Sequence, residues 1–161
     1  MNYRIGFGVD FHQLVPGRKL MLGGMELPSE KGALGHSDGD VLLHAICDAL
    51  LGALNLGDIG IHFPNTDPDL KDIDSKILLS KTYALVKEKN YSIANIDATI
   101  CLEKPRVSPY ANRMREIIAG ILDISSDQIS IKATTTERMG FVGREEGIVA
   151  YATLLLGANA K

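Results

Sequence analysis

Apolar and polar residues alternate near the start of the chain. Between residues 4 and 9, every second residue is apolar, namely Ile5, Phe7 and Val9. This two-residue period predicts a half-buried strand that ends at Asp10. Residues 19–22 and 25–27 then flank Gly23-Gly24. Two glycines can adopt the positive φ angles of a two-residue loop, so a short hairpin is expected after the first strand.

Residues 41–54 carry a helical pattern. Their apolar residues recur at intervals of three and four, at Leu42, Ala45, Ile46, Ala49, Leu50 and Ala53. This stripe predicts a helix packed against a sheet. At about 100° per residue, Asp40, His44 and Asp48 lie together on the opposite face. His44 is therefore expected outside the apolar stripe, beside two acidic residues.

The rest of the chain predicts a loop followed by alternating strands and helices. Residues 57–68 show no period and are rich in glycine, proline and short polar residues, which is typical of a functional loop. One helix is expected from Asp74 or Ser75 to about Asn90, and a second from Ser108-Pro109. Strands are expected at residues 96–102, 129–132 and 148–156. The last of these is almost continuously apolar, which favours burial of both its faces.

These elements predict an α/β protein of the two-layer α+β type, with helices packed on one face of a mixed sheet. The chain has 161 residues, of which 45% are hydrophobic. That length can bury one core but is too short for two ordinary domains. Residues 1–161 are therefore expected to form a single domain.

Charge and composition narrow the class of partner. The formal net charge is −3, so the chain lacks the basic surface that dominates nucleic-acid binding, and no nucleic acid is expected as a partner. Neither a signal segment nor a long apolar stretch is evident, which predicts a cytoplasmic protein without a membrane partner. Cys47 and Cys101 lie far apart, so neither a disulfide framework nor a cysteine metal site is indicated.

Three side chains suggest a metal site. Asp10 and His12 lie two apart and would face the same side of a strand, and His44 follows in His36-Ser37-Asp38-Gly39-Asp40-x-x-x-His44. Three protein ligands leave one coordination position of zinc open, which is typical of a catalytic rather than a structural ion. Asp40 or Asp48 could accept the remaining ring N–H of His44 and fix its tautomer. This pattern indicates an enzyme.

Two further segments have the chemistry to bind phosphate. Ser37-x-x-Asp40 has the form of a capping box, and the helix N-terminus beside His36 could hold an anion, although simple capping is the commoner use of such residues. Farther along, three consecutive threonines precede Glu137, which could hold a hard divalent ion. A threonine run can also reflect strand propensity alone.

Four blocks of sequence resemble one enzyme family over almost the whole chain. They are Gly6-x-Gly8-x-Asp10-x-His12-x-Leu14, His36-Ser37-Asp38-Gly39-Asp40, Gly57-Asp58-Ile59-Gly60 with Phe63-Pro64, and Lys132-Ala133-Thr134-Thr135-Thr136-Glu137 with Gly140-Phe141-x-Gly143-Arg144. The family is the 2-C-methyl-D-erythritol 2,4-cyclodiphosphate synthases. The resemblance implies a homotrimer of the non-mevalonate isoprenoid pathway that converts 4-diphosphocytidyl-2-C-methyl-D-erythritol 2-phosphate into the cyclic diphosphate and CMP.

The resemblance also implies roles for individual residues. Zinc would be held by Asp10, His12 and His44, and magnesium or manganese by Glu137. His36 and Thr135 would stabilise charge in the transition state, and Ser37 would orient the attacking end of the substrate. The sugar region would be lined by Asp58, Ile59, Gly60, Phe63, Pro64, Asn65, Thr66 and Asp67. The cytidine and phosphate pocket would be formed by Leu102, Glu103, Lys104, Pro105, Arg106, Val107 and Ser108 together with Thr134, Thr135, Thr136 and Glu137.

The chain departs from the family pattern at a few positions. Asn65 stands where many members carry aspartate, and Arg106 stands where lysine is frequent. Members also have an apolar cavity on the trimer axis, near Phe141 and Arg144, that can hold an isoprenoid diphosphate. Val9 occupies a position that is often aromatic in that cavity, so the resemblance does not define which ligand this chain would prefer.

Two other functions fit the motifs taken without the resemblance. A zinc phosphohydrolase would use the open coordination position to activate water. A non-enzymatic nucleotide-binding module would use the ion to stabilise its fold, although a structural zinc normally has a fourth protein ligand.

Overall fold

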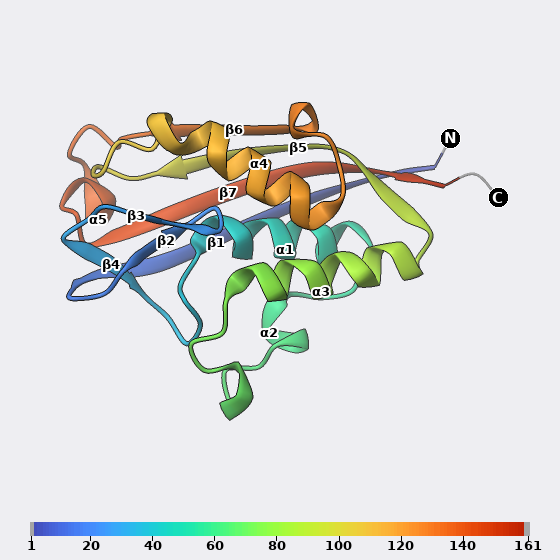
Figure 1. Cartoon of the computed structure of the whole chain (residues 1–161), viewed down its shortest axis with the longest axis horizontal. Helices are drawn as coiled ribbons and strands as arrows, with labels where there is room; N and C mark the ends of the chain where they lie inside the picture. The colour runs from blue at the N-terminus through green and yellow to red at the C-terminus, as the bar shows by residue number, and fades with distance from the viewer. Residues whose placement is uncertain (1, 160–161) are drawn as a thin grey trace.

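The last strand of the chain forms the centre of the sheet. A computed structural model describes residues 2–159, and within them five strands form one mixed sheet in the order β4-β1-β7-β5-β6. Strand β7 (Gly147–Ala158) pairs antiparallel with β1 (Tyr3–Pro16) and with β5 (Tyr91–Cys101). At the edges, β4 (Lys31–Leu34) is antiparallel to β1, and β6 (Ile129–Thr134) is parallel to β5 (Figure 1).

The predicted hairpin is confirmed. Strands β2 (Leu20–Leu22) and β3 (Met25–Leu27) pair antiparallel. Gly23 and Gly24 connect them with φ angles of 60° and 81°, which residues with a side chain adopt only at a cost. The backbone N–H groups of both glycines donate to the carboxylate of Asp40, at 3.0 and 2.7 Å. The hairpin is thereby fastened to the start of the first helix.

Three helices cover one face of the sheet, as predicted (Figure 1). They are α1 (Val41–Ala53), α3 (Ser75–Glu88) and α4 (Ala111–Leu122). Shorter helical turns are α2 (Ile59–His62), η1 (Pro68–Leu70), η2 (Ser108–Tyr110), η3 (Ser126–Gln128) and α5 (Gly140–Gly143). Among residues 2–159, no helix is both long and apolar enough to cross a membrane.

Two glycines of β1 let α1 lie directly on the strand. A Cβ atom on Gly6 would come within 1.8 Å of the Ala49 carbonyl oxygen, and one on Gly8 within 2.0 Å of the Ala45 carbonyl oxygen. Any side chain at these positions would therefore force the helix away from the sheet. Because Asp10 and His12 continue the same face of β1, the close packing places them beside the helix.

The opposite face of the sheet is open in the single chain, and apolar side chains gather on its β1 and β7 part. Five exposed apolar side chains, here called the outer patch, are Ile5, Phe7 and Phe11 of β1, Tyr151 of β7, and Phe141 of α5, whose ring lies beside that of Phe11. Ile5 is 74% exposed and Phe7 is 61% exposed. The alternation in residues 4–9 thus identified a strand whose apolar side faces away from the core, because glycines fill the core side. In β7 likewise, one face is buried in the chain while Tyr151 and Thr153 on the other are exposed.

Other expectations from the sequence need correction. Strand β1 does not end at Asp10 but continues to Pro16, because β7 and β4 both pair with its second half. Strand β4 was not expected, since four residues are too few to show a period. Residues 57–68 were expected to lack helical structure, yet α2 forms there. Asp58 caps it by accepting from Ile61 N at 3.1 Å.

Candidate metal centre

The structure brings together the side chains of Asp10, His12 and His44, as the sequence predicted. Their donor atoms form a nearly equilateral triangle. Asp10 Oδ2 lies 3.0 Å from His12 Nε2 and 3.0 Å from His44 Nδ1, and the two ring nitrogens are 3.2 Å apart. The three residues form a group that could hold a metal ion.

The spacing of these atoms fits a small tetrahedral ion. Ligands about 2.0–2.1 Å from zinc in tetrahedral geometry lie about 3.3 Å from one another. The observed distances of 3.0–3.2 Å are close to that value. Two imidazole nitrogens and one carboxylate oxygen are also a donor set that zinc prefers. The residues present therefore fit zinc, and with three protein ligands a fourth coordination position would be left for another group.

The electrostatics of the triangle favour a cation. Burial alone would raise the pKa of the Asp10 carboxyl, but hydrogen bonds and charge attraction from His12 and His44 hold that pKa well below its ordinary value of 3.8. Burial lowers the pKa of His12, yet the interactions with Asp10 outweigh it, so that pKa lies above 6.5. The negative oxygen of Asp10 thus faces two ring nitrogens. A positive charge held between these three atoms, either a proton or a metal ion, would be stabilised.

The second nitrogen of each histidine has its own partner. His12 Nδ1 lies 3.0 Å from the carbonyl oxygen of Leu34, so this nitrogen carries the proton and Nε2 keeps its lone pair. His44 Nε2 lies 2.8 Å from Ser75 Oγ and 3.2 Å from Ser37 Oγ. The prediction that Asp40 or Asp48 would serve His44 is wrong. Asp48 instead accepts from the backbone N–H of Ile59 at 2.7 Å.

Asp40 is the N-cap of α1, which also corrects the proposed capping box. The Asp40 carboxylate accepts from Leu43 N at 3.1 Å and from the two hairpin glycines. Ser37 lies one turn before the helix and accepts from Gly39 N at 3.2 Å. The carboxylate of Asp40 therefore occupies the N-terminus of α1, which is the simple capping named above as the commoner use of such residues.

The metal triangle opens into a cavity of about 340 Å³. Predicted site residues that line it with the triangle are His36, Ser37, Ile59, Gly60, Phe63 and Asn65. The other residues predicted for the sugar region, Asp58, Pro64, Thr66 and Asp67, are not among those that line this cavity. The Asp58 carboxylate caps α2, and the Asp67 carboxylate accepts from Asp69 N at 3.0 Å. The backbone carbonyl of Asp67 lies 3.2 Å from His36 Nε2 and holds that ring in place.

The residues predicted for the cytidine end line a separate cavity. It has a volume of about 210 Å³, and its walls include Leu102, Glu103, Pro105, Arg106, Val107, Ser108, Thr134 and Thr135. Glu103 organises the loop after β6 by accepting from Thr136 N at 2.8 Å and Arg138 N at 3.4 Å. These bonds hold the pKa of the Glu103 carboxyl below its usual value. They also support the positive φ angles of Glu137 and Arg138, 53° and 64°.

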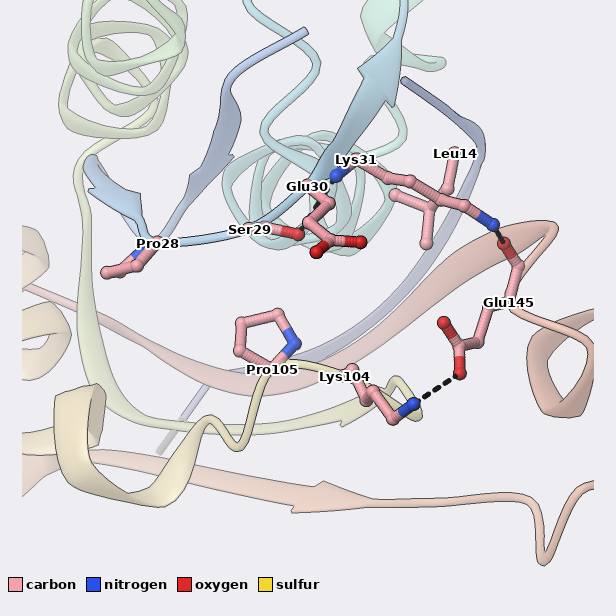
Figure 2. A pocket seen from close by; sticks show the side chains of 8 residues that line it. All are labelled: Leu14, Pro28, Ser29, Glu30, Lys31, Lys104, Pro105 and Glu145. Atoms are coloured by element: carbon pink, nitrogen blue, oxygen red, sulfur yellow. Dashed lines mark hydrogen bonds and ion pairs between the residues drawn. The ribbon is translucent and has the colours of Figure 1, made fainter. Parts of the chain in front are cut away.

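Several predicted residues lie outside both cavities. Glu137 is exposed, and Thr135 Oγ1 lies 3.3 Å from its carboxylate. Arg144 pairs with Glu146 at 2.9 Å. Lys104 lines a further cavity of about 370 Å³ and pairs there with Glu145 at 3.1 Å. Figure 2 shows Lys31 reaching the backbone carbonyl of the same Glu145, at 2.8 Å. Both lysines of that cavity therefore already have partners.

Sequence reasoning missed Ser75 as a site residue. It was expected only near the start of a helix, and it is indeed the first residue of α3. Its contact with His44 joins positions 31 residues apart, and the pattern of neither segment signals this contact. Asp74-Ser75 before a helix predicts only an N-cap, and Asp74 is indeed the N-cap of α3.

The fold and site together define a two-layer α+β protein with three side chains placed to hold a metal ion. Comparison with known proteins places it further: the YgbB family pattern matches residues 3–157, and the chain belongs to that family. A relative from Bacteroides fragilis named 2-C-methyl-D-erythritol 2,4-cyclodiphosphate synthase is 60% identical over 156 residues, which are 97% of this chain and 98% of the relative.

Solved structures agree with this assignment. IspF from Plasmodium falciparum in complex with CDP superposes with a TM-score of 0.88 at 34% identity, covering 99% of this chain and 98% of that one. The bifunctional IspDF of Campylobacter jejuni superposes with a TM-score of 0.93 at 39% identity. The superposition covers 96% of the chain described here and 42% of that longer protein.

Proposed function

We propose that this chain is a 2-C-methyl-D-erythritol 2,4-cyclodiphosphate synthase, a CMP-releasing lyase of the non-mevalonate isoprenoid pathway. The observation that carries the proposal is the open metal triangle at the wall of a polar cavity, in a chain 60% identical to a relative of that name. The substrate would be 4-diphosphocytidyl-2-C-methyl-D-erythritol 2-phosphate.

The reaction is an internal phosphoryl transfer. An oxygen of the 2-phosphate would form a bond to the β-phosphorus, and the bond from that phosphorus to the oxygen bridging to the α-phosphate would break. CMP would leave with the bridging oxygen and its electron pair. Positioning and charge neutralisation do most of the work in such reactions. Good alignment alone can contribute on the order of 7–11 kcal/mol.

Two groups of residues would position the substrate and neutralise its charge: the metal triangle with its neighbours, and residues 134–137. Asp10, His12 and His44 would hold zinc, which as a Lewis acid would polarise a phosphate oxygen. Glu137 would hold magnesium or manganese. His36 and Thr135 would donate hydrogen bonds to developing charge, and Ser37 would orient the attacking phosphate. Backbone groups of residues 102–108 and 134–137 would hold the cytidine, in line with the CDP bound in a solved relative.

A homotrimer would bring the two halves of the site together. In one chain, the metal triangle and the cytidine-end residues line different cavities. The outer patch also leaves large apolar side chains exposed, including stacked Phe7 and Tyr151 rings 6.4 Å apart. Such a patch is typical of an interface. We infer that copies of the chain associate through this face, so that the cytidine end of one subunit completes the metal cavity of the next.

An isoprenoid diphosphate ligand and a cytoplasmic location stay predictions. Phe141 belongs to the outer patch and Arg144 follows it on the same turn. Together they would serve an isoprenoid diphosphate in a cavity on the trimer axis. The location is predicted to be cytoplasmic.

Product analysis in heavy-oxygen water tests the proposed reaction. The substrate is incubated with protein that has been stripped of metal and then resupplied with zinc and magnesium. We expect CMP release that depends on zinc, a cyclic diphosphate in the mass spectrum, and no solvent oxygen in either product. A phosphohydrolase would instead leave one labelled oxygen in a phosphate product and form no cycle. Zinc that is needed for folding, in a protein that does not turn the substrate over, would indicate a non-enzymatic nucleotide-binding module.

A further inference from the structure

Ser75 contacts a predicted metal ligand from a completely buried position. It is the first residue of α3, its exposed fraction is 0%, and its Oγ lies 2.8 Å from His44 Nε2. This nitrogen is the one that faces away from Asp10 and His12. Ser75 is therefore not a metal ligand itself, but it contacts the ring nitrogen of His44 that would not bind the metal.

The hydrogen bonds around Ser75 have only one consistent direction. Its hydroxyl makes a short hydrogen bond to Asp38 Oδ1, and its backbone N–H donates to Asp38 Oδ2 at 3.0 Å. An ionised carboxylate can only accept, so the hydroxyl hydrogen of Ser75 points to Asp38. Ser75 Oγ must then accept from His44, which requires the proton of that ring to be on Nε2.

The consequence appears on the other side of the ring. With the proton on Nε2, His44 Nδ1 has a free lone pair directed at the point where Asp10 Oδ2 and His12 Nε2 also meet. A metal ion needs this tautomer, because a protonated Nδ1 would point a hydrogen at the ion.

Ser37 cannot fix the tautomer in the same way. Its Oγ is 3.2 Å from His44 Nε2 and accepts from Gly39 N, but no carboxylate within residues 2–159 takes up its hydroxyl hydrogen. A free hydroxyl can donate to a bare Nε2 as readily as it can accept from a protonated one. The direction therefore comes from Asp38 through Ser75.

We propose that Asp38 and Ser75 are positioning residues that hold His44 in its metal-binding tautomer and thereby set the zinc affinity of the centre; this inference rests on the proposed zinc site. The pair also ties α3 to the segment before α1. Asp38 N donates to Ile73 O at 3.1 Å, and Asp72 N donates to His36 O at 2.7 Å. The same segment lines the metal cavity through His36 and Ser37.

The test uses two variants and one matched control. Ser75→Ala removes the acceptor, and Asp38→Asn replaces a two-oxygen acceptor by an amide that can accept with one oxygen only. Ser80→Ala makes the same chemical change on the exposed side of the same helix. Each full-length protein is stripped of metal, its ring nitrogens are observed by ¹⁵N NMR, and its zinc affinity is measured by competition with a chromogenic chelator.

In the metal-free wild type, we expect Nε2 of His44 to carry a proton, whether or not Nδ1 also carries one toward Asp10. Ser75→Ala and Asp38→Asn should shift the ring toward mixed tautomers and weaken zinc binding roughly 10- to 100-fold, the usual effect of removing such a partner. Ser80→Ala should match the wild type in both measurements. A purely structural role for Ser75 would alter the melting temperature without changing the ring tautomer.

Two results would overturn the inference. One is a wild-type His44 whose Nε2 carries no proton. The other is a pair of folded variants whose zinc affinity stays within about twofold of the wild type. If Ser75→Ala does not fold, Asp38→Asn decides, because Asp38 is only partly buried. A wild type that binds no zinc but shows the Nε2 proton would instead refute the proposed zinc site. The hydrogen bonds from His44 through Ser75 to Asp38 would still stand.

Discussion

Gly8 of β1 lies against the backbone of Ala45 in α1, so close that a Cβ atom at Gly8 would sit 2.0 Å from the Ala45 carbonyl oxygen. His44 is the neighbour of Ala45, and Asp10 lies two residues beyond Gly8 on the same face of the strand. The absence of a side chain at Gly8 thus sets the distance between a strand that carries two predicted ligands and a helix that carries the third.

Gly8→Ala should therefore damage both the fold and the metal site. Real Cβ atoms do not approach a backbone oxygen that closely, so the helix must move, and overpacking typically costs about 1–3 kcal/mol or more. We expect a lower free energy of unfolding in urea and a loss of zinc affinity. Gly120→Ala in α4 is the control, because a Cβ there meets no atom within 4 Å. A Gly8→Ala protein with wild-type stability would show that the close packing is not needed.

His44→Ala should abolish tight zinc binding, since it removes one of three ligands. The rest of α1 packs through its apolar residues, so the variant is expected to fold. Zinc bound per chain is measured by plasma emission spectrometry after gel filtration. Circular dichroism checks that the variant is folded. Full zinc occupancy in a folded variant would contradict the assignment.

Glu137→Gln should keep zinc and lose most turnover. The substitution preserves size but weakens a ligand for a hard divalent ion, while the metal triangle lies in a cavity that Glu137 does not line. Rates of CMP release across a magnesium titration should fall most at limiting magnesium. Glu116→Gln, an equally conservative change at an exposed residue of α4, should leave the titration unchanged. Unchanged rates for Glu137→Gln would remove this residue from the mechanism.

Phe7→Ser should weaken association between subunits. Phe7 is 61% exposed in the single chain and stacks on Tyr151 in the outer patch, so burial in an interface would contribute roughly 1.5–3 kcal/mol per copy. Light scattering at micromolar concentration should report a trimer for the wild type and a smaller mass for the variant. Ile77→Ser, which changes an exposed apolar residue of α3, is the control. A fully active wild-type monomer would refute the proposed trimer.

The sequence predicted the ligands better than their surroundings. Asp10 and His12 could be found because a strand puts residues two apart on one side, and His44 because a helix separates its polar and apolar faces. Local periodicity could not reveal Ser75 or the carbonyl of Leu34, since both reach the histidines across the fold. It also could not tell which face of β1 is the core. The apolar side of the alternation is exposed, and two glycines form the buried side.

The separation of the metal triangle from Glu137 within one chain has a consequence for mixtures of inactive proteins. His44→Ala damages only the metal half of a site, and Glu137→Gln damages only the other half. If neighbouring subunits share each site as proposed, a trimer assembled from both variants contains one site in which both halves are intact. Two separately inactive preparations, unfolded together and refolded as a mixture, would then regain part of the activity by subunit complementation.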